Sequence, residues 1–258
     1  MPLSTGPSAV PPRTIPPLAA GSPRYDEAMA MFAARAAAAL DDRPATEIIR
    51  WAHELFGDRL AVTSSMGDGL IAHLCAMVVP HVEVLFLDTG YHFPETYRFA
   101  ARIAAGHSGT GTGGPTVRTI LPARTVTEQD QVHGPQLYAR NPDLCCRLRK
   151  VEPLDAALAG YDAWISGIRR DETVDRAATP VVGYDVRRRI VKISPIAHWT
   201  RQDADAYLRR HRVPVHPLAP AGYPSIGCAP CTRPVAPGED PRSGRWAGTA
   251  KSECGIHR

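Results

Sequence analysis

Two kinds of hydrophobic pattern follow each other along the chain, and together they predict alternating helices and strands. Apolar residues recur at the three- to four-residue spacing of an amphipathic helix in residues 25–40, 45–56, 70–79 and 94–105. Short runs of consecutive apolar residues lie between and after these segments, and such runs are typical of strands buried on both faces. The predicted strands are residues 60–63, 82–87, 117–121, 163–166 and 189–193.

This alternation predicts an α/β protein with a twisted parallel sheet and helices on both faces. In such sheets ligands bind beyond the carboxyl ends of the strands. Residues 64–69, 88–93 and 166–171 each leave the end of a predicted strand and are rich in polar and Gly residues. We therefore expect these three loops to form the rim of a binding site.

The composition changes at both ends of the chain and once in the middle. Residues 1–23 are rich in Pro and lack a charged segment leading into an apolar one, which predicts a disordered arm and no secretory signal. Residues 106–115 are mostly Gly, Thr and Ser and predict a surface loop. Helical and strand periodicity is lost from Pro214 onward. We therefore expect the arm 1–23, an α/β domain 24–235 and an irregular, mobile C-terminal tail 236–258.

The overall composition excludes several classes of protein. The chain has 258 residues, of which 22% are charged, and a formal charge of +4, which is ordinary for a soluble domain. Its arginines fall on separate loops, which argues against a nucleic-acid partner. No run of about 18 apolar residues is present, so no membrane span is expected. We expect a cytoplasmic protein, whose six cysteines favour metal or redox chemistry over disulfides.

Two pairs of cysteines have a spacing that suits metal binding. Cys145 and Cys146 are adjacent, and Cys228 and Cys231 form a CxxC motif. Four thiolates suit zinc or a 4Fe–4S cluster, and the spacing does not distinguish the two. Neighbours on a helix point about 100° apart, so the adjacent pair needs a local bend to reach one centre. The alternative is buried packing for the first pair and a redox pair or zinc half-site for the second.

The other two cysteines differ in their surroundings. Cys254 lies four residues from the C-terminus in the polar sequence SECGIHR, beside Lys251 and His257. Nearby positive charge favours a thiolate, so Cys254 is either a nucleophile or an incidental free thiol on the tail. Cys75 lies within an apolar helix and is predicted to fill the core.

Two of the strand-end loops are candidates for binding an anion. Residues 64–69 form a polar turn between a strand and a helix, where backbone N–H groups bind phosphate; an ordinary capped turn is the alternative. Arg169 and Arg170 follow a predicted strand. They are either a forked clamp for phosphate or sulfate or part of a solvated loop.

Other arginines lie farther along the chain. Arg242 and Arg245 are close to Cys254 in sequence and are candidate anion ligands brought in with the tail. The three consecutive arginines at 187–189 predict a solvated hairpin turn.

Five segments between about residue 51 and 257 carry a shared signature. They are FLDTGYHFPET at 86–96, CCxxRK at 145–150, WISGIRRD at 164–171, YPSIGCxxCT at 223–232 and ECGIH at 253–257. Together they resemble the APS/PAPS reductase family, named for adenosine 5′-phosphosulfate (APS) and its 3′-phosphorylated form (PAPS). The double cysteine and the two C-terminal motifs are highly specific in combination, and the tail is similar to that of bacterial iron–sulfur APS reductases. The Ala-, Arg- and Pro-rich composition resembles that of actinobacterial members.

The resemblance implies a fold like that of the PP-loop adenine-nucleotide hydrolases and a 4Fe–4S cluster on Cys145, Cys146, Cys228 and Cys231. It implies that Cys254 attacks the sulfur of APS, releases AMP and carries an S-sulfonate, from which thioredoxin or a similar dithiol frees sulfite in sulfate assimilation. PAPS-specific members generally lack the two cysteine pairs, so the pairs point to APS. The substrate-binding residues expected on this basis are Ser64, Ser65, Asp68, Leu87, Asp88, Thr89, Gly90, Lys150, Gly167, Arg169, Arg170, Arg242, Arg245 and His257.

Lys150 follows Cys146 by about one helical turn, on the same face. Thiol attack itself needs no electron relay, so we expect the cluster to act by electrostatics. We expect Lys150 to link the charge of the cluster to the substrate.

Three alternatives to this function remain from the sequence. A PAPS reductase differs in accepting the 3′-phosphate. An ATP-using PP-loop enzyme needs a Ser-Gly-Gly-x-Asp-Ser-type loop, which is absent, and leaves Cys254 without a role. A non-catalytic iron–sulfur or zinc regulator that binds nucleic acid needs a concentrated basic stripe and a recognition helix. The oligomeric state, including a homo-oligomer, is open.

Overall fold

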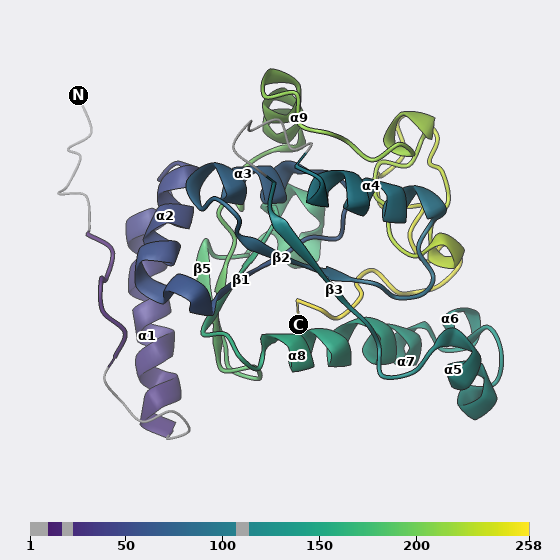
Figure 1. Cartoon of the computed structure of the whole chain (residues 1–258), viewed down its shortest axis with the longest axis horizontal. Helices are drawn as coiled ribbons and strands as arrows, with labels where there is room; N and C mark the ends of the chain where they lie inside the picture. Colours follow the sequence, from purple (N-terminus) through teal and green to yellow (C-terminus); the bar gives the residue numbers. More distant parts are fainter. Residues whose placement is uncertain (1–9, 17–22, 107–113, 258) are drawn as a thin grey trace.

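The computed structural model describes residues 10–16, 23–106 and 114–257. Within them, a six-stranded sheet has the order β3-β2-β1-β4-β6-β5, with helices on both sides of it (Figure 1). Neighbouring strands are parallel except β5, which pairs antiparallel with β6 at one edge. This mostly parallel sheet confirms the predicted fold class. The strands are β1 (Leu60–Thr63), β2 (Glu83–Leu87), β3 (Thr116–Ile120), β4 (Ala163–Ser166), β5 (Val182–Asp185) and β6 (Ile190–Ile193).

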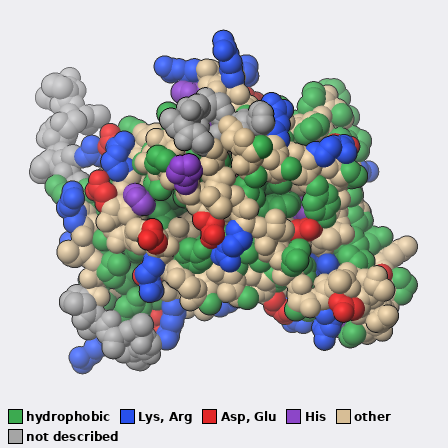
Figure 2. All heavy atoms as spheres, viewed as in Figure 1, with side chains coloured by type: hydrophobic (Ala, Val, Ile, Leu, Met, Phe, Trp, Pro, Cys, Tyr) green, Lys and Arg blue, Asp and Glu red, His purple; other side chains and the backbone are tan. Residues whose placement is uncertain are grey.

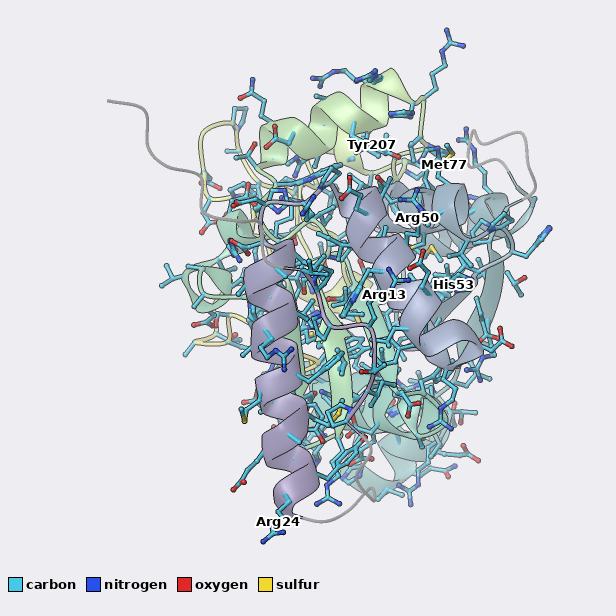
Figure 3. The ribbon with its side chains drawn as sticks, turned by 90° about the vertical axis from the view of Figure 1, so that its left-hand side faces the viewer. Arg13, Arg24, Arg50, His53, Met77 and Tyr207 are labelled. Carbon is cyan, nitrogen blue, oxygen red and sulfur yellow. The ribbon has the colours of Figure 1, made fainter. Side chains whose placement is uncertain are left out.

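Helices cover the two faces of the sheet and one side of it. In Figure 1, α3 (Leu70–Val78), α4 (Pro94–Ala104) and α9 (Arg201–Arg210) lie above the sheet, and α7 (Pro142–Cys146) and α8 (Glu152–Leu158) lie below it. Figure 3 looks onto α1 (Pro23–Leu40) and α2 (Ala45–Phe56), which lie side by side. The shorter elements are α5 (Val126–His133), α6 (Leu137–Arg140), a π-helix (Arg147–Val151) and the 3-10 turns Gly57–Arg59, η3 (Arg170–Glu172), η4 (Val174–Arg176), Ala219–Ala221 and Ala229–Cys231.

Local sequence signals explain where several helices begin and end. Pro94 is the first residue of α4, where its missing N–H is not needed. Thr200 and Asp203 form a capping box at the start of α9. Gly57 follows the last residue of α2, with a φ of 52° that an L-residue rarely adopts.

The strands place alternate side chains in two separate cores. Val62, Val84 and Ile165 point to the side of α3 and α4 and belong to the larger core. Their neighbours Ala61, Leu85 and Trp164 belong to a smaller core that includes Leu154 and Leu158 of α8, with Ile256 of the tail packed against it. Successive strand residues face opposite sides of the sheet. Because Ile256 packs on the smaller core, the C-terminal segment lies under the sheet, on the same side as α8.

Two features near the sheet edge differ from the sequence prediction. β5 is not predicted, because only its first residue, Val182, is buried and Gly183 interrupts the pattern. The 187–189 run does form the turn between β5 and β6, but Arg188 is not solvated. Its side chain is 4% exposed, donates hydrogen bonds to Asp155 and Asp185, and lies 5.8 Å from the Trp164 ring centroid.

Parts of the predicted arm and insert lie outside the described residues. Of the arm, residues 10–16 are described, and the Trp51 indole donates a hydrogen bond of 2.9 Å to the Pro12 carbonyl. Of the predicted 106–115 loop, residues 107–113 are not described. On the face seen in Figure 2, Lys and Arg side chains are interspersed with Asp and Glu. Among the described residues, no helix is both long and apolar enough to cross a membrane.

Candidate active site

A cavity of about 820 Å³ lies beyond the carboxyl ends of β1, β2 and β4. This is the position that the parallel sheet predicts for a ligand, and the volume suits a nucleotide-sized molecule. Residues far apart in the sequence converge on it, including the tail. The predicted residues that line it are Ser64, Ser65, Asp68, Leu87, Thr89, Lys150, Gly167, Arg169, Arg170, Arg242, Arg245, Cys254 and His257.

The loop after β1 is a tight turn that leads into α3. The Ser64 hydroxyl accepts a hydrogen bond from the Met66 N–H, and Met66 has a φ of 56°. The Asp68 carboxylate accepts from the Leu70 N–H at the start of α3. Burial, partly offset by that N–H and by Arg169, raises the pKa of Asp68 above its ordinary value. The loop therefore presents polar groups and the first turn of a helix to the cavity.

The loop after β2 turns toward the cysteine pairs. Asp88 accepts hydrogen bonds from the Gly90 N–H and the Tyr97 hydroxyl, both at 2.8 Å. Thr89 is fully buried, and its hydroxyl oxygen lies 3.2 Å from the Cys228 sulfur. Asp88 and Gly90, although predicted to bind substrate, are not among the described residues that line the large cavity. Their role in the structure is to shape the loop that carries Thr89.

The four paired cysteines line a second, much smaller cavity of about 10 Å³. Cys145 and Cys146 are the last two residues of α7, and the π-helix begins directly after them. Burial and the neighbouring sulfurs raise the pKa of Cys145 to about 12 and that of Cys231 to about 11. A bound positive centre would favour the thiolates that burial disfavours. Among the described residues, no group of three or more His, Cys, Asp or Glu side chains is arranged to hold a single metal ion.

Lys150 connects the two cavities, since it lines both. Its side chain is buried. Burial disfavours the ammonium, but the sulfurs of Cys228, Cys254 and Cys146, when charged, outweigh this and raise the pKa of Lys150. Lys150 thus lines one cavity together with Cys146, as its spacing predicts, and the other together with Cys254.

The four predicted arginines differ in what they contact. Arg169 bonds to Asp171 at 3.0 Å, and Arg170 donates to Asp41 at the end of α1 and to the Thr179 carbonyl. Their guanidinium groups are therefore engaged by acceptors of the protein itself.

Arg242 and Arg245 lie on the tail side of the cavity. Arg242 donates to the Ser252 carbonyl at 2.9 Å. Arg245 donates to the Ser225 hydroxyl at 3.2 Å, while its buried Nε has no hydrogen-bond partner among the described residues. Burial and the charge of Arg242 lower the pKa of Arg245, although a guanidinium stays charged at neutral pH. A buried cation in the wall of the cavity suits an anionic ligand.

The tail places Cys254 and His257 inside the molecule. Cys254 is half-buried at the large cavity, and the His257 ring stacks on Trp164 of β4 with centroids 5.6 Å apart. Burial and the charges of Lys192 and Arg176 lower the pKa of His257 well below its ordinary value, so the ring is neutral at pH 7. Stacking on the sheet thus fixes the chain just after the thiol.

Three buried residues of the site are absent from the sequence prediction. Arg149 lies between Thr89 and the cysteine cavity, and Arg176 contacts Glu253 beside Cys254. Arg149 and Glu253 stand within motifs that carry the family resemblance, so that signal could have identified them. Arg176 stands in a polar loop segment with no motif of its own.

Comparisons with known proteins show the family of the chain. The family described as "Phosphoadenosine phosphosulfate reductase domain" matches residues 59–234. The chain is 53% identical over 234 residues to a Streptomyces coelicolor protein named adenosine 5′-phosphosulfate reductase, covering 91% of this chain and 97% of the relative. It is 49% identical over 226 residues to a Mycolicibacterium smegmatis protein of the same name, covering 88% and 93%.

Solved structures show the same fold. The structure of phosphoadenylyl-sulfate reductase from Candida auris superimposes with a TM-score of 0.67 at 29% identity, covering 80% of this chain and 97% of that one. A Candida glabrata FMN adenylyltransferase, at 14% identity and a TM-score of 0.52, covers 77% of this chain and 67% of its own and shares the fold alone. From the match over residues 59–234 and the relatives near 50% identity, the chain belongs to the phosphoadenosine phosphosulfate reductase domain family.

Proposed function

We propose that the protein reduces adenosine 5′-phosphosulfate to sulfite and AMP during sulfate assimilation. The Cys254 thiolate attacks the sulfate sulfur, the bond from sulfur to the bridging oxygen breaks, and AMP leaves with the electron pair. Cys254 then carries an S-sulfonate. A thiolate of thioredoxin or a similar dithiol attacks the Cys254 sulfur and releases sulfite, and its second thiol closes a disulfide and frees Cys254. The dithiol is oxidised as the sulfate sulfur is reduced.

The position of Cys254 carries this proposal. A thiol four residues from the C-terminus lies in the same cavity as the loop after β1 and the buried cation Lys150. APS is an anion, so a thiolate can approach it only where its charge is neutralised. The cavity is lined by Lys150 and Arg245, whose positive charges serve that purpose.

The residues that line the second cavity support a 4Fe–4S cluster. All four predicted ligands, Cys145, Cys146, Cys228 and Cys231, surround one small space, and sulfur donors of this number suit such a cluster. When bound, the cluster supplies a fixed electrostatic field next to Lys150. Lys150 of this chain then faces the cluster ligands on one side and the Cys254 cavity on the other.

The relatives favour APS over PAPS as the substrate. Proteins that this chain matches at 46–53% identity are named for APS, whereas the Candida auris enzyme named for PAPS matches at 29%. The two cysteine pairs point in the same direction.

The proposal is tested by intact-protein mass spectrometry of anaerobically purified protein incubated with APS or PAPS without reductant. We expect the mass of one SO₃ to be added with APS, little addition with PAPS, and none in Cys254→Ser. Equal addition with PAPS would indicate the 3′-phosphorylated substrate instead. A wild-type protein that keeps its iron and gains no mass with either nucleotide would contradict the nucleophilic role of Cys254.

A further inference from the structure

Glu253, the residue before Cys254, is buried although it belongs to a polar tail. Its side chain is 9% exposed. Its carboxylate accepts hydrogen bonds of 2.8 Å from both Nε and Nη2 of Arg176, which is the two-bond fork of a strong arginine–carboxylate pair. The Thr173 hydroxyl donates a third bond at 3.3 Å, and Arg242 lies 3.3 Å away. This set of contacts fixes the carboxylate in position and direction.

Arg176 also has contacts within the domain that do not involve the tail. It ends the η4 turn in the segment that follows β4, and its side chain is 13% exposed. Its Nη1 donates a hydrogen bond of 2.5 Å to the Glu172 carboxylate, which also accepts one of 3.0 Å from the Arg169 N–H. Because Glu172 orients the guanidinium from the protein side, Arg176 offers its other edge to Glu253 with little further loss of side-chain freedom.

The neighbours of Glu253 are also bound to separate parts of the domain. Lys251 pairs with Asp143 at the start of α7, and the Ser252 hydroxyl lies 3.2 Å from an oxygen of Asp175 in η4. Immediately before the thiol, the tail thus runs from α7, which contains Cys145 and Cys146, to the η4 turn. After the thiol, Gly255 has a φ of 84° and reverses the chain toward His257. The position of Cys254 is therefore set by its flanking residues.

We propose that Arg176 and Glu253 are positioning residues, a charged latch that holds Cys254 in the cavity for attack on the substrate and that opens before the reductant acts. This inference rests on the function proposed above. The two half-reactions require opposite states of the latch. Attack by Cys254 needs the tail in the cavity, whereas a dithiol must reach the Cys254 sulfur while it carries the sulfonate.

The two half-reactions therefore respond to the latch in opposite ways. In Arg176→Met the closed tail loses its two-bond fork, and the carboxylates of Glu253 and Glu172 both lose their hydrogen bonds to the guanidinium. Truncating one partner of a buried charge pair weakens an association at least about tenfold. We expect single-turnover sulfonation of Cys254 by APS to slow about tenfold or more. Release of sulfite from the sulfonated protein by dithiothreitol should be unchanged or faster.

Three further variants separate the latch from general damage. Arg176→Lys keeps the charge but not the fork, so its sulfonation rate should lie between wild type and Arg176→Met. Glu253→Gln combined with Arg176→Met should be no slower than Arg176→Met alone, because Arg176→Met has already removed the fork to Glu253. Arg59→Met removes another arginine–carboxylate pair, with Asp162, outside the cavity, and should leave both half-reactions at wild-type rates.

A measurement without substrate distinguishes failure of the latch from failure of the proposed function. Alkylation of Cys254 by iodoacetamide, followed by peptide mass spectrometry, should be about tenfold faster in Arg176→Met than in wild type or Arg59→Met if the tail opens more often. Equal alkylation rates would overturn the latch, whether or not APS sulfonates the protein. A parallel loss of both half-reactions in Arg176→Met would also overturn it, because that is the signature of a merely structural residue.

Discussion

Arg149 joins the loop after β2 to the cysteine cavity, and its removal should disturb both. Arg149 as a whole is 4% exposed. It donates hydrogen bonds to the Thr89 carbonyl and, at 3.1 Å, to the side-chain oxygen of Gln129, and it lies 5.3 Å from the Tyr91 ring centroid. Thr89 in turn contacts the Cys228 sulfur. Replacement by Met keeps the apolar stem but leaves two buried acceptors without their donor.

The expected magnitude follows from these contacts. A hydrogen bond from a charged donor contributes about 1.5–3 kcal/mol, and a buried cation–π contact about 1 kcal/mol. Because the loop relaxes in part, we expect Arg149→Met to lower the free energy of unfolding by about 3–4 kcal/mol. For a chain of this size that corresponds to a melting temperature about 10 °C lower. Thermal unfolding by circular dichroism measures the change, and iron content per chain measures the proposed cluster.

Arg118→Met is the matched control. Like Arg149, Arg118 donates hydrogen bonds to two acceptors, here the Glu83 carboxylate and the Tyr161 hydroxyl, but its side chain is 42% exposed. Its loss should cost less than about 1 kcal/mol and leave the iron content unchanged. The reasoning is wrong if Arg149→Met melts within about 2 °C of Arg118→Met and binds as much iron as wild type.

Two further predictions concern the fold around the site. His73 is buried in α3 with Nδ1 2.8 Å from the Tyr207 hydroxyl, and burial followed by the charge of His211 lowers its pKa to about 4. Because an unfolded His titrates near 6.5, the unfolded chain binds more protons between pH 6.5 and 4, and stability falls as the pH falls. The urea midpoint of the wild type should therefore fall over this pH range, and that of His73→Gln should fall less. Equal falls in the two proteins would contradict this. At Gly90, with a φ of 71°, a Cβ would lie 2.9 Å from Arg149 Nη2 and 3.0 Å from Val126, so Gly90→Ala should lower stability by about 2 kcal/mol. Gly160→Ala, where a Cβ meets open space, should change it by less than about 0.5 kcal/mol, and equal losses in the two variants would refute the steric argument.

The sheet was predictable because its buried strands are continuous apolar runs. The predicted strands 60–63, 163–166 and 189–193 agree with β1, β4 and β6 to within one residue. β5 was not predicted, because an edge strand with one buried residue and a glycine has little hydrophobic pattern. The burial of Arg188 was likewise not predictable, because its partners Asp155 and Asp185 come from separate elements.

The sequence determined which loops lie at the carboxyl ends of the strands, since that follows from the order of helices and strands. Its motifs also identified the two cysteine pairs and the thiol at Cys254. Only the tertiary structure decided that the tail runs under the sheet, with His257 stacked on Trp164.

The structure also decided which charged residues face each other at the thiol. Arg176 and Glu253 are separated by 77 residues, and no local periodicity relates them. A sequence pattern records the surroundings of a residue along its own helix or strand. The pairing of two loop side chains depends instead on how the whole chain folds, so the contacts that position Cys254 are a property of the tertiary structure.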